Sequence, residues 1–223
     1  MNGKQDSLNY LSSTNKLRVL SFLAKFSDRE FHEREIARRT GISYGSANRV
    51  LNELFKDGMV VRRQAGKMLF YSFNQRDPLA RTFKMFVSVS ILRPLIIRLR
   101  ESASEIILYG SCARGEDTSA SDIDLFLVSE NRQESLEIID SYVFSRGFER
   151  LRIEPVIRTP LDMIESEKKD AEFLSLVREG IVLWDQLQDE TEIQGLPEAE
   201  EDHPVSERKP AHRKRTSVGA RRP

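Results

Sequence analysis

Two aspartates separated by one residue are the side chains of this sequence with the clearest chemical potential. Asp122 and Asp124 open a strongly apolar run, with Ile123 between them. Because alternate residues of a strand point to the same side, the two carboxylates should project together while Ile123 is buried on the other face. Paired carboxylates offer hard oxygen ligands to Mg²⁺, or to Mn²⁺, which bind through carboxylates and substrate phosphates. The spacing therefore predicts a divalent metal site.

A glycine-serine pair lies shortly before the aspartates and could hold phosphate. Gly110 lets the backbone approach a triphosphate without a Cβ clash, and Ser111 offers a hydroxyl and an amide at the expected start of a helix. Arg114 carries a fork of donors that suits phosphate oxygens. These residues predict a nucleoside triphosphate site, with ATP as the expected nucleotide, beside the metal site.

The segment GSCARGEDTSASDIDLFLV, from Gly110 to Val128, contains both features. It resembles the DNA polymerase β-like nucleotidyltransferase superfamily, and most of all its minimal nucleotidyltransferase branch, over residues 102–187. The resemblance implies transfer of a nucleoside monophosphate from a nucleoside triphosphate to an acceptor hydroxyl, with two Mg²⁺ ions held by three carboxylates. By analogy with toxin–antitoxin pairs, the acceptor could be a hydroxyl of a toxin-like partner protein.

The third carboxylate implied by this resemblance is matched by Glu154, in the stretch LRIEPVIRTP. Asp122, Asp124 and Glu154 are thus the expected catalytic residues and metal ligands. Two alternatives remain open at this stage, because Glu149 lies nearby and Glu154 could be a solvated strand residue. If Glu154 is not a ligand, the domain would bind nucleotide but transfer slowly or not at all.

The elements that position these residues alternate between strand and helix, which predicts an α/β layer with one sheet. Strands are expected at 105–109, 123–128, 151–157 and 181–184, and helices at 132–146, 160–168 and 171–179.

A second pattern, over residues 14–75, predicts three helices followed by a hairpin. Thr14 and Ser43 can cap the first and third helices, and Gly41 provides a tight turn after a second helix at 32–39. The third helix is expected to end near Lys56 and to bury one stripe, namely Ala47, Val50, Leu51, Leu54 and Phe55. The hairpin strands are expected at 59–63 and 68–73.

This pattern, carried by EIARRTGISYGSANRVLNELFKDGMVVRR, resembles winged-helix transcription regulators. In a helix-turn-helix the second helix of the motif enters the major groove, so the third helix here should read duplex DNA. The alternative is a winged helix used only for protein contact or dimerisation. The expected DNA-facing residues are Tyr44, Ser46, Asn48, Arg49 and Asn52 on the helix and Arg62, Arg63 and Lys67 on the hairpin.

The charge of the chain is unevenly distributed, although its formal net charge is zero. Residues 1–75 carry 13 Lys and Arg against 7 Asp and Glu, whereas residues 102–187 carry 9 against 18. A basic first part suits a polyanion, and an acidic second part suits metal ions. We therefore divide the chain into a DNA-binding domain (1–75), a linker helix (76–101) capped by Asp77 and interrupted at Pro94, a nucleotidyltransferase domain (102–187) and a disordered polyampholyte tail (188–223).

Several functional classes are disfavoured by the sequence. It contains no run of eighteen apolar residues and no apolar signal core at its start, and its single cysteine forms no internal disulfide framework. We expect a cytoplasmic two-domain α+β and α/β protein with no membrane partner and with a homodimer as its candidate assembly. Two functions compete: a DNA-binding nucleotidyltransferase, and a transcription regulator whose second domain senses nucleotide or binds a partner without turnover.

Overall fold

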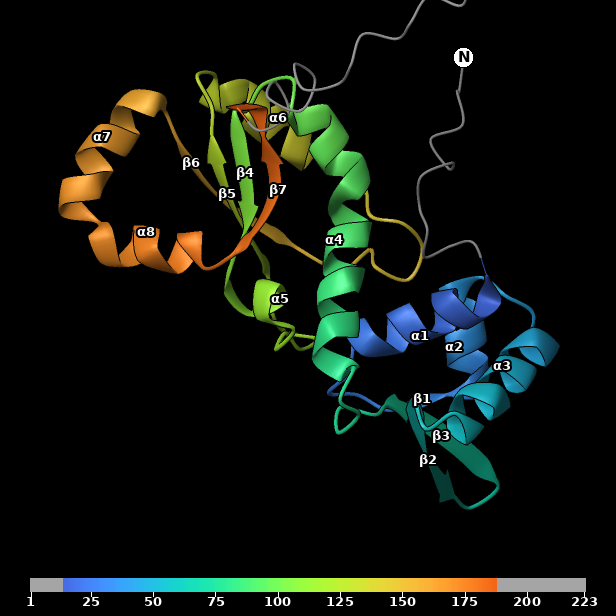
Figure 1. The fold of residues 1–223 in the computed structure, drawn as a ribbon. Coiled ribbons are helices and arrows are strands. Elements are labelled where there is room, and N and C mark those ends of the chain that lie inside the picture. Colours follow the sequence, from blue (N-terminus) through green and yellow to red (C-terminus); the bar gives the residue numbers. More distant parts are fainter. Residues whose placement is uncertain (1–13, 188–223) are drawn as a thin grey trace, which may run out of the picture.

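A long helix joins two parts of the molecule, as Figure 1 shows. The computed structural model describes residues 14–187, except the side chains of 166–168. The connecting helix, α4 (Ala80–Leu99), packs against α1 of the first part and against α5 and α6 of the second. The predicted tail at 188–223 lies outside the described residues.

The first part contains three helices and a small antiparallel sheet. The helices are α1 (Asn15–Lys25), α2 (Glu33–Thr40) and α3 (Tyr44–Lys56), and the strand order is β1 (Phe31–His32), β3 (Met68–Phe73), β2 (Val60–Ala65). The expected caps are confirmed, since Thr14 accepts from the Leu17 N–H and Ser43 from the Ser46 N–H. The sequence did not predict β1, because two residues are too few to show a strand period.

The predicted buried stripe of α3 is wrong at one position. Phe55 is 38% exposed, whereas Ala47, Val50, Leu51 and Leu54 are buried. Phe55 follows Leu54 directly and is therefore turned by about 100° around the helix, to the edge of the stripe. The Arg62 guanidinium covers its ring at 4.1 Å from the centroid.

Helix α4 differs from the expectation at its start and at Pro94. Asp77 accepts a hydrogen bond from the Leu79 N–H, but the helix begins only at Ala80. Pro94 lacks the N–H that would continue the hydrogen-bond ladder, yet the helix runs through it without a break. Leu92, Leu95 and Leu99, all fully buried, hold the helix by packing on both sides of the proline.

The second part is built on a four-stranded sheet of order β6-β5-β4-β7. Strand β4 is antiparallel to β5 and β7, whereas β5 and β6 are parallel. The predicted helix at 132–146 is too long, since α6 ends at Asp140 and the Tyr142 hydroxyl donates to the Ile91 carbonyl of α4. The bounds are β4 (Glu105–Leu108), α5 (Gly110–Arg114), β5 (Ile123–Val128), α6 (Arg132–Asp140), β6 (Ile153–Arg158), α7 (Pro160–Lys169), α8 (Ala171–Arg178) and β7 (Ile181–Asp185).

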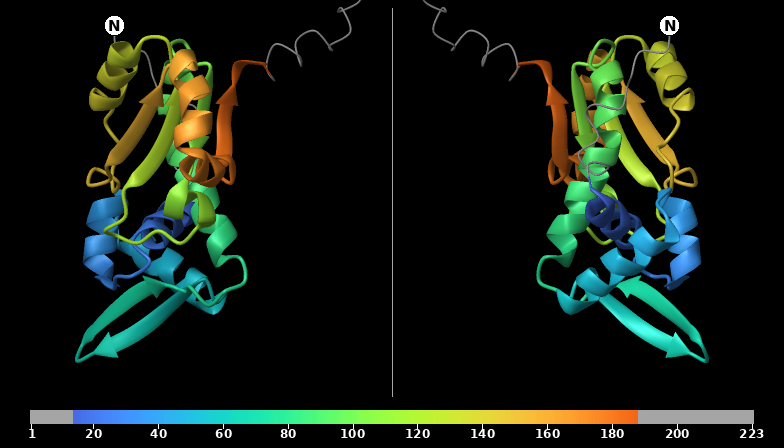
Figure 2. Two further views of the ribbon diagram at one scale, coloured as in Figure 1. Left: turned by 90° about the vertical axis from the view of Figure 1, so that its left-hand side faces the viewer. Right: turned by 90° about the vertical axis from the view of Figure 1, so that its right-hand side faces the viewer.

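Helices cover both faces of this sheet, as the side views in Figure 2 show. Ile106, Leu108 and Leu125 point into the core shared with α4 and α6. Ile107 and Phe126 point the other way and pack against Leu174 and Val177 of α8. The alternation along β4 and β5 thus assigns each residue to one face, and it decides where the polar residues at the strand ends project.

A buried polar contact connects the two parts. Lys25 at the end of α1 places its Nζ 2.8 Å from Oδ2 of Asp117, and both side chains are 1% exposed. Lys84 of α4 lies 3.6 Å from the other carboxylate oxygen. Nearby, the Asp28 carboxylate accepts from the backbone N–H and the hydroxyl of Ser119, each at 2.7 Å. The loop that follows α5 is therefore fixed to the helices of the first part.

Candidate active site

Asp122, Asp124 and Glu154 lie at the start of two neighbouring parallel strands. In the register of β5 and β6, Asp124 is directly opposite Glu154. Ile123 is fully buried on the other face, as the sequence predicted, while Asp122 is exposed. Residues paired across a sheet project to the same side, so the carboxylates of Asp124 and Glu154 are neighbours.

The charges of Asp122 and Glu154 act on Asp124. Its pKa is raised, first by burial and then by the negative charges of Asp122 and Glu154, while Arg114 acts in the opposite direction. Like charges disfavour ionisation in this way only when they lie close together. Negative charge is therefore concentrated at the N-terminal ends of β5 and β6.

Glu149, the competitor of Glu154, lies in a different environment. Burial raises its pKa, but backbone N–H groups and the charges of Arg39 and Arg146 lower it more, so that the net shift is downward. Glu149 thus faces arginines of both parts of the molecule, and the strand register brings Glu154, not Glu149, beside Asp124.

The fit of these acids to divalent cations rests on their donor chemistry. Carboxylate oxygens are the ligands that Mg²⁺ and Mn²⁺ prefer, and a cation would relieve the repulsion that raises the pKa of Asp124. Within residues 14–187, no three His, Cys, Asp or Glu side chains converge closely enough to form a complete metal centre by themselves. Substrate phosphate oxygens would therefore have to complete the coordination.

Gly110 brings the backbone against these carboxylates. It adopts φ of +69°, and a Cβ added there would lie 2.2 Å from Oδ2 of Asp124. A side chain at this position would therefore strain the backbone and collide with the proposed ligand. The half-buried Ser111 follows directly in α5.

Arg114, the third residue predicted to hold the triphosphate, has a protein partner. Its Nε donates to Glu116 at 2.9 Å, and Glu116 also pairs with Arg81 of α4. The Arg114 side chain is half exposed, so this pair is screened by water and inexpensive to exchange. A bound triphosphate could therefore compete with Glu116 for Arg114.

Tyr109 is a residue of this site that the sequence analysis did not identify. The pKa of its hydroxyl is raised by burial and by the charges of Asp124 and Glu154. Its ring packs edge-on against Phe173 of α8, with centroids 5.7 Å apart. Its position in the sequence could have identified it, because Tyr109 directly precedes Gly110 at the end of an apolar strand. Cys112, by contrast, is fully buried.

On the surface of α3, several residues predicted to face DNA are held by one glutamate. Glu33 is 5% exposed and accepts from the Tyr44 hydroxyl at 2.8 Å, the Asn48 amide at 3.1 Å and the Tyr71 hydroxyl at 3.2 Å. Glu33 was not identified from the sequence, because its partners lie on two other elements, α3 and β3. Arg49 is exposed on the same helix.

The remaining predicted DNA-facing residues lie on the exposed hairpin and at the start of α3. Arg63 makes a two-pronged contact with Glu30, with its Nε 2.9 Å from one carboxylate oxygen, and Arg62 donates to Asn52 at 3.3 Å. Lys67 is exposed at the turn between β2 and β3. Ser46 donates its backbone N–H to the cap Ser43.

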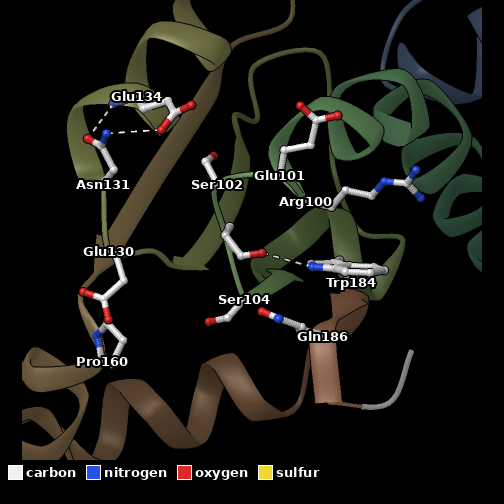
Figure 3. A pocket seen from close by; sticks show the side chains of 11 residues that line it. Arg100, Glu101, Ser102, Ser104, Glu130, Asn131, Glu134, Pro160, Trp184 and Gln186 are labelled. Carbon is white, nitrogen blue, oxygen red and sulfur yellow. Dashed lines mark hydrogen bonds between the residues drawn. The ribbon is translucent and has the colours of Figure 1, made fainter. Parts of the chain in front are cut away.

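A hollow of about 670 Å³ at the opposite end of the sheet contains none of the predicted residues (Figure 3). Its polar groups largely bind one another. The Trp184 indole donates to the Ala103 carbonyl at 3.0 Å, and Asn131 contacts Glu134. It therefore contributes nothing to the candidate active site.

The fold and the site define a winged-helix domain joined to a nucleotidyltransferase fold. In the family models, the MarR family matches residues 11–67, and the nucleotidyltransferase domain matches residues 94–192. The chain therefore combines a winged helix-turn-helix domain of the MarR family with a nucleotidyltransferase domain, as the sequence analysis predicted.

A search of solved structures identified a candidate nucleotidyltransferase from Sulfolobus solfataricus. It is 16% identical and covers 48% of this chain and 89% of its own, with a TM-score of 0.32 that is too low to bear on the fold. No curated protein matches the chain significantly. Among the described residues, no helix has the length and apolarity needed to cross a bilayer.

Proposed function

We propose that this protein transfers a nucleoside monophosphate from a nucleoside triphosphate, with ATP as the expected donor, to an acceptor hydroxyl, and that its winged helix binds duplex DNA. The observation that carries the proposal is the placement of Asp124 opposite Glu154, with Asp122 and the backbone of Gly110 beside it. The nucleotidyltransferase domain and the MarR-family domain support the two halves of the proposal.

Each residue then has a defined task. Asp122, Asp124 and Glu154 would hold the divalent ions, which when bound supply positive charge to the attacking and leaving oxygens. Gly110 and Ser111 hold the triphosphate, and Arg114 leaves Glu116 to neutralise it. The acceptor oxygen forms a bond to the α-phosphorus, the bond to the leaving pyrophosphate breaks, and the acceptor proton passes to the Glu154 carboxylate.

The test is transfer of label from α-labelled ATP in the presence of Mg²⁺. The full-length protein is incubated with cell RNA, with short DNA strands or with cell protein, and the labelled fraction is identified. We expect label in one fraction and none when the divalent ion is chelated. Absence of label in every fraction, with Mg²⁺ and with Mn²⁺, would refute the transferase.

A nucleotide-sensing regulator without turnover is the second candidate. It is favoured by the pairing of Arg114 with Glu116 and by the absence of a complete three-ligand centre within residues 14–187. In this case ATP would change the affinity for duplex DNA while no label is transferred. The identity of the acceptor as a toxin-like partner protein stays a prediction from the sequence resemblance.

A further inference from the structure

A cleft lined by arginines lies where the winged helix meets the nucleotidyltransferase domain. It has a volume of about 470 Å³. Arg29 and Arg39 come from the first part of the chain, and Arg150 and Arg152 come from the second. Neither domain forms the cleft alone, and none of these four residues belongs to the carboxylate site or to the DNA-reading helix.

The arginines of this cleft outnumber the acidic residues around them. Within the described part of the chain, Arg29, Arg150 and Arg152 are exposed and form no ion pair. Arg39 pairs with Glu35 at 3.2 Å, but its Nε is buried without a hydrogen-bond partner. Glu149 is the acidic residue in the lining, and from outside it Glu35 pairs with Arg39 and Asp28 interacts with Arg29. The four arginines still outnumber these acids, which suits an anionic ligand.

The cleft opens beside the carboxylates. The Arg152 carbonyl accepts the Ile123 N–H at 2.9 Å, and Arg152 directly precedes β6, two residues before Glu154. Ser119, another lining residue, belongs to the loop between α5 and Asp122. An anion held by the arginines would therefore end close to Asp122.

We propose that this cleft binds the phosphate backbone at the end of a single nucleic acid strand. Guanidinium groups match phosphate oxygens in pairs, and several of them in a row suit successive phosphates. The volume is in the range of small-molecule sites, so the cleft admits one or two nucleotides and excludes a duplex. This part of the inference rests on the proposed transferase function. The terminal hydroxyl of the strand is then the acceptor that is presented to Asp122, Asp124 and Glu154.

The experiment compares two charge-matched double variants of the full-length protein. Arg29→Ala with Arg150→Ala removes two of the four cleft arginines, whereas Arg49→Ala with Lys67→Ala alters the predicted DNA-reading surface. Binding of labelled eight-nucleotide strands and of a labelled duplex is measured by fluorescence anisotropy across a salt series, without nucleotide. The thermal midpoint of each variant is recorded, and Arg29→Lys with Arg150→Lys serves as the charge-conserving version.

We expect each double variant to lose affinity for a different ligand, which we call a crossed result. The cleft variant should lose about tenfold or more in strand affinity and about 1.4 in the log–log salt slope, because each strand phosphate contributes about 0.7. Its duplex affinity should change little, while the surface variant should show the reverse. The lysine version should keep the salt slope of the wild type.

Wild-type strand binding by the cleft variant, or equal losses in both variants, would overturn the proposal. In a separate titration with ATP, loss of ATP binding by the cleft variant with unchanged strand binding would also overturn it, and would assign the arginines to the triphosphate. Since strand binding is measured without turnover, a crossed result without any label transfer would leave the cleft in place and remove only the transferase function.

Discussion

The carboxylate site and the predicted DNA-reading surface differ in whether their charged side chains have partners within the protein. At the carboxylate site, Asp122, Asp124 and Glu154 repel one another and form no ion pair within residues 14–187. On the DNA-reading surface, Arg63 is paired with Glu30, and Tyr44 is bonded to Glu33. In the proposed function, a cation would relieve the repulsion at the first surface, whereas DNA would have to replace an internal partner at the second.

The cost of that exchange differs between the two glutamates. The Arg63–Glu30 pair is exposed on both sides, and such pairs contribute little to stability because water screens them. Glu33 is 5% exposed and satisfies three donors, so releasing it would leave a buried charge without partners. Arg63 is thus free to exchange partners, whereas Tyr44 and Asn48 are held as part of the structure.

The largest expected effect concerns Asp124. Asp124→Asn removes a charge that is proposed to hold the divalent ions, and the rate of label transfer should fall by at least about a hundredfold, the scale seen when a preorganised stabilising group is lost. Asp140→Asn, an exposed acid at the end of α6, is the matched control and should transfer at the wild-type rate. Equal rates in the two variants would exclude the carboxylate site.

Glu154→Gln tests the strand register against the competitor. Because Glu154 lies opposite Asp124, its loss should resemble the loss of Asp124, while Glu149→Gln should change the transfer rate by less than about threefold. Both rates are measured at saturating ATP and Mg²⁺. A large loss in Glu149→Gln with little change in Glu154→Gln would assign the third ligand to Glu149. The raised pKa of Asp124 would then have to be explained without a role for Glu154 in the site.

A smaller effect is expected on the DNA-reading surface. Glu30→Gln removes the partner of Arg63, so duplex affinity should rise several-fold and the log–log salt slope should steepen by about 0.9, the value of one phosphate contact. Glu53→Gln removes the same charge from the exposed face of α3 without releasing Arg63 and provides the control. If duplex affinity rises equally in the two variants, the loss of a negative charge explains the gain, and the release of Arg63 does not.

The smallest effect is on stability. The folded pKa of Asp124 lies above its ordinary value, so its charged form is disfavoured by folding and lowers stability at neutral pH. Without divalent ions, Asp124→Asn should therefore raise the thermal midpoint at pH 7, and this gain should disappear as the pH falls below the ordinary pKa of aspartate. Mg²⁺ with ATP should stabilise the wild type more than the variant. A lower midpoint in the metal-free variant would contradict the electrostatic account.

The elements of the fold could be predicted wherever a local signal sets them. Caps at Thr14 and Ser43 and the apolar run after Asp122 gave helix and strand boundaries that the structure confirms. Local signals failed for β1, which exists only because Phe31 and His32 pair with β3. They also failed at Pro94, where packing of α4 between both parts outweighs the missing hydrogen bond.

The site was less predictable, because its geometry depends on pairing between distant segments. Asp122, Asp124 and Gly110 lie in one short stretch, and the antiparallel pairing of the neighbouring strands β4 and β5 brings them together. The choice between Glu154 and Glu149 requires the register of β5 against β6, which no local pattern reveals. The arginine cleft was also invisible in the sequence, since its residues come from separate segments of two domains.

The buried pair of Lys25 and Asp117 bears on the evolution of this fusion. A recombination that replaced the winged helix by another would remove Lys25 and leave Asp117 with Lys84 at 3.6 Å as its remaining cationic partner. Breaking a buried ion pair on one side costs about 3–5 kcal/mol, a large share of the stability of an ordinary domain. The two domains should therefore be inherited together, and lineages that exchanged one should carry a compensating change at the position of the other.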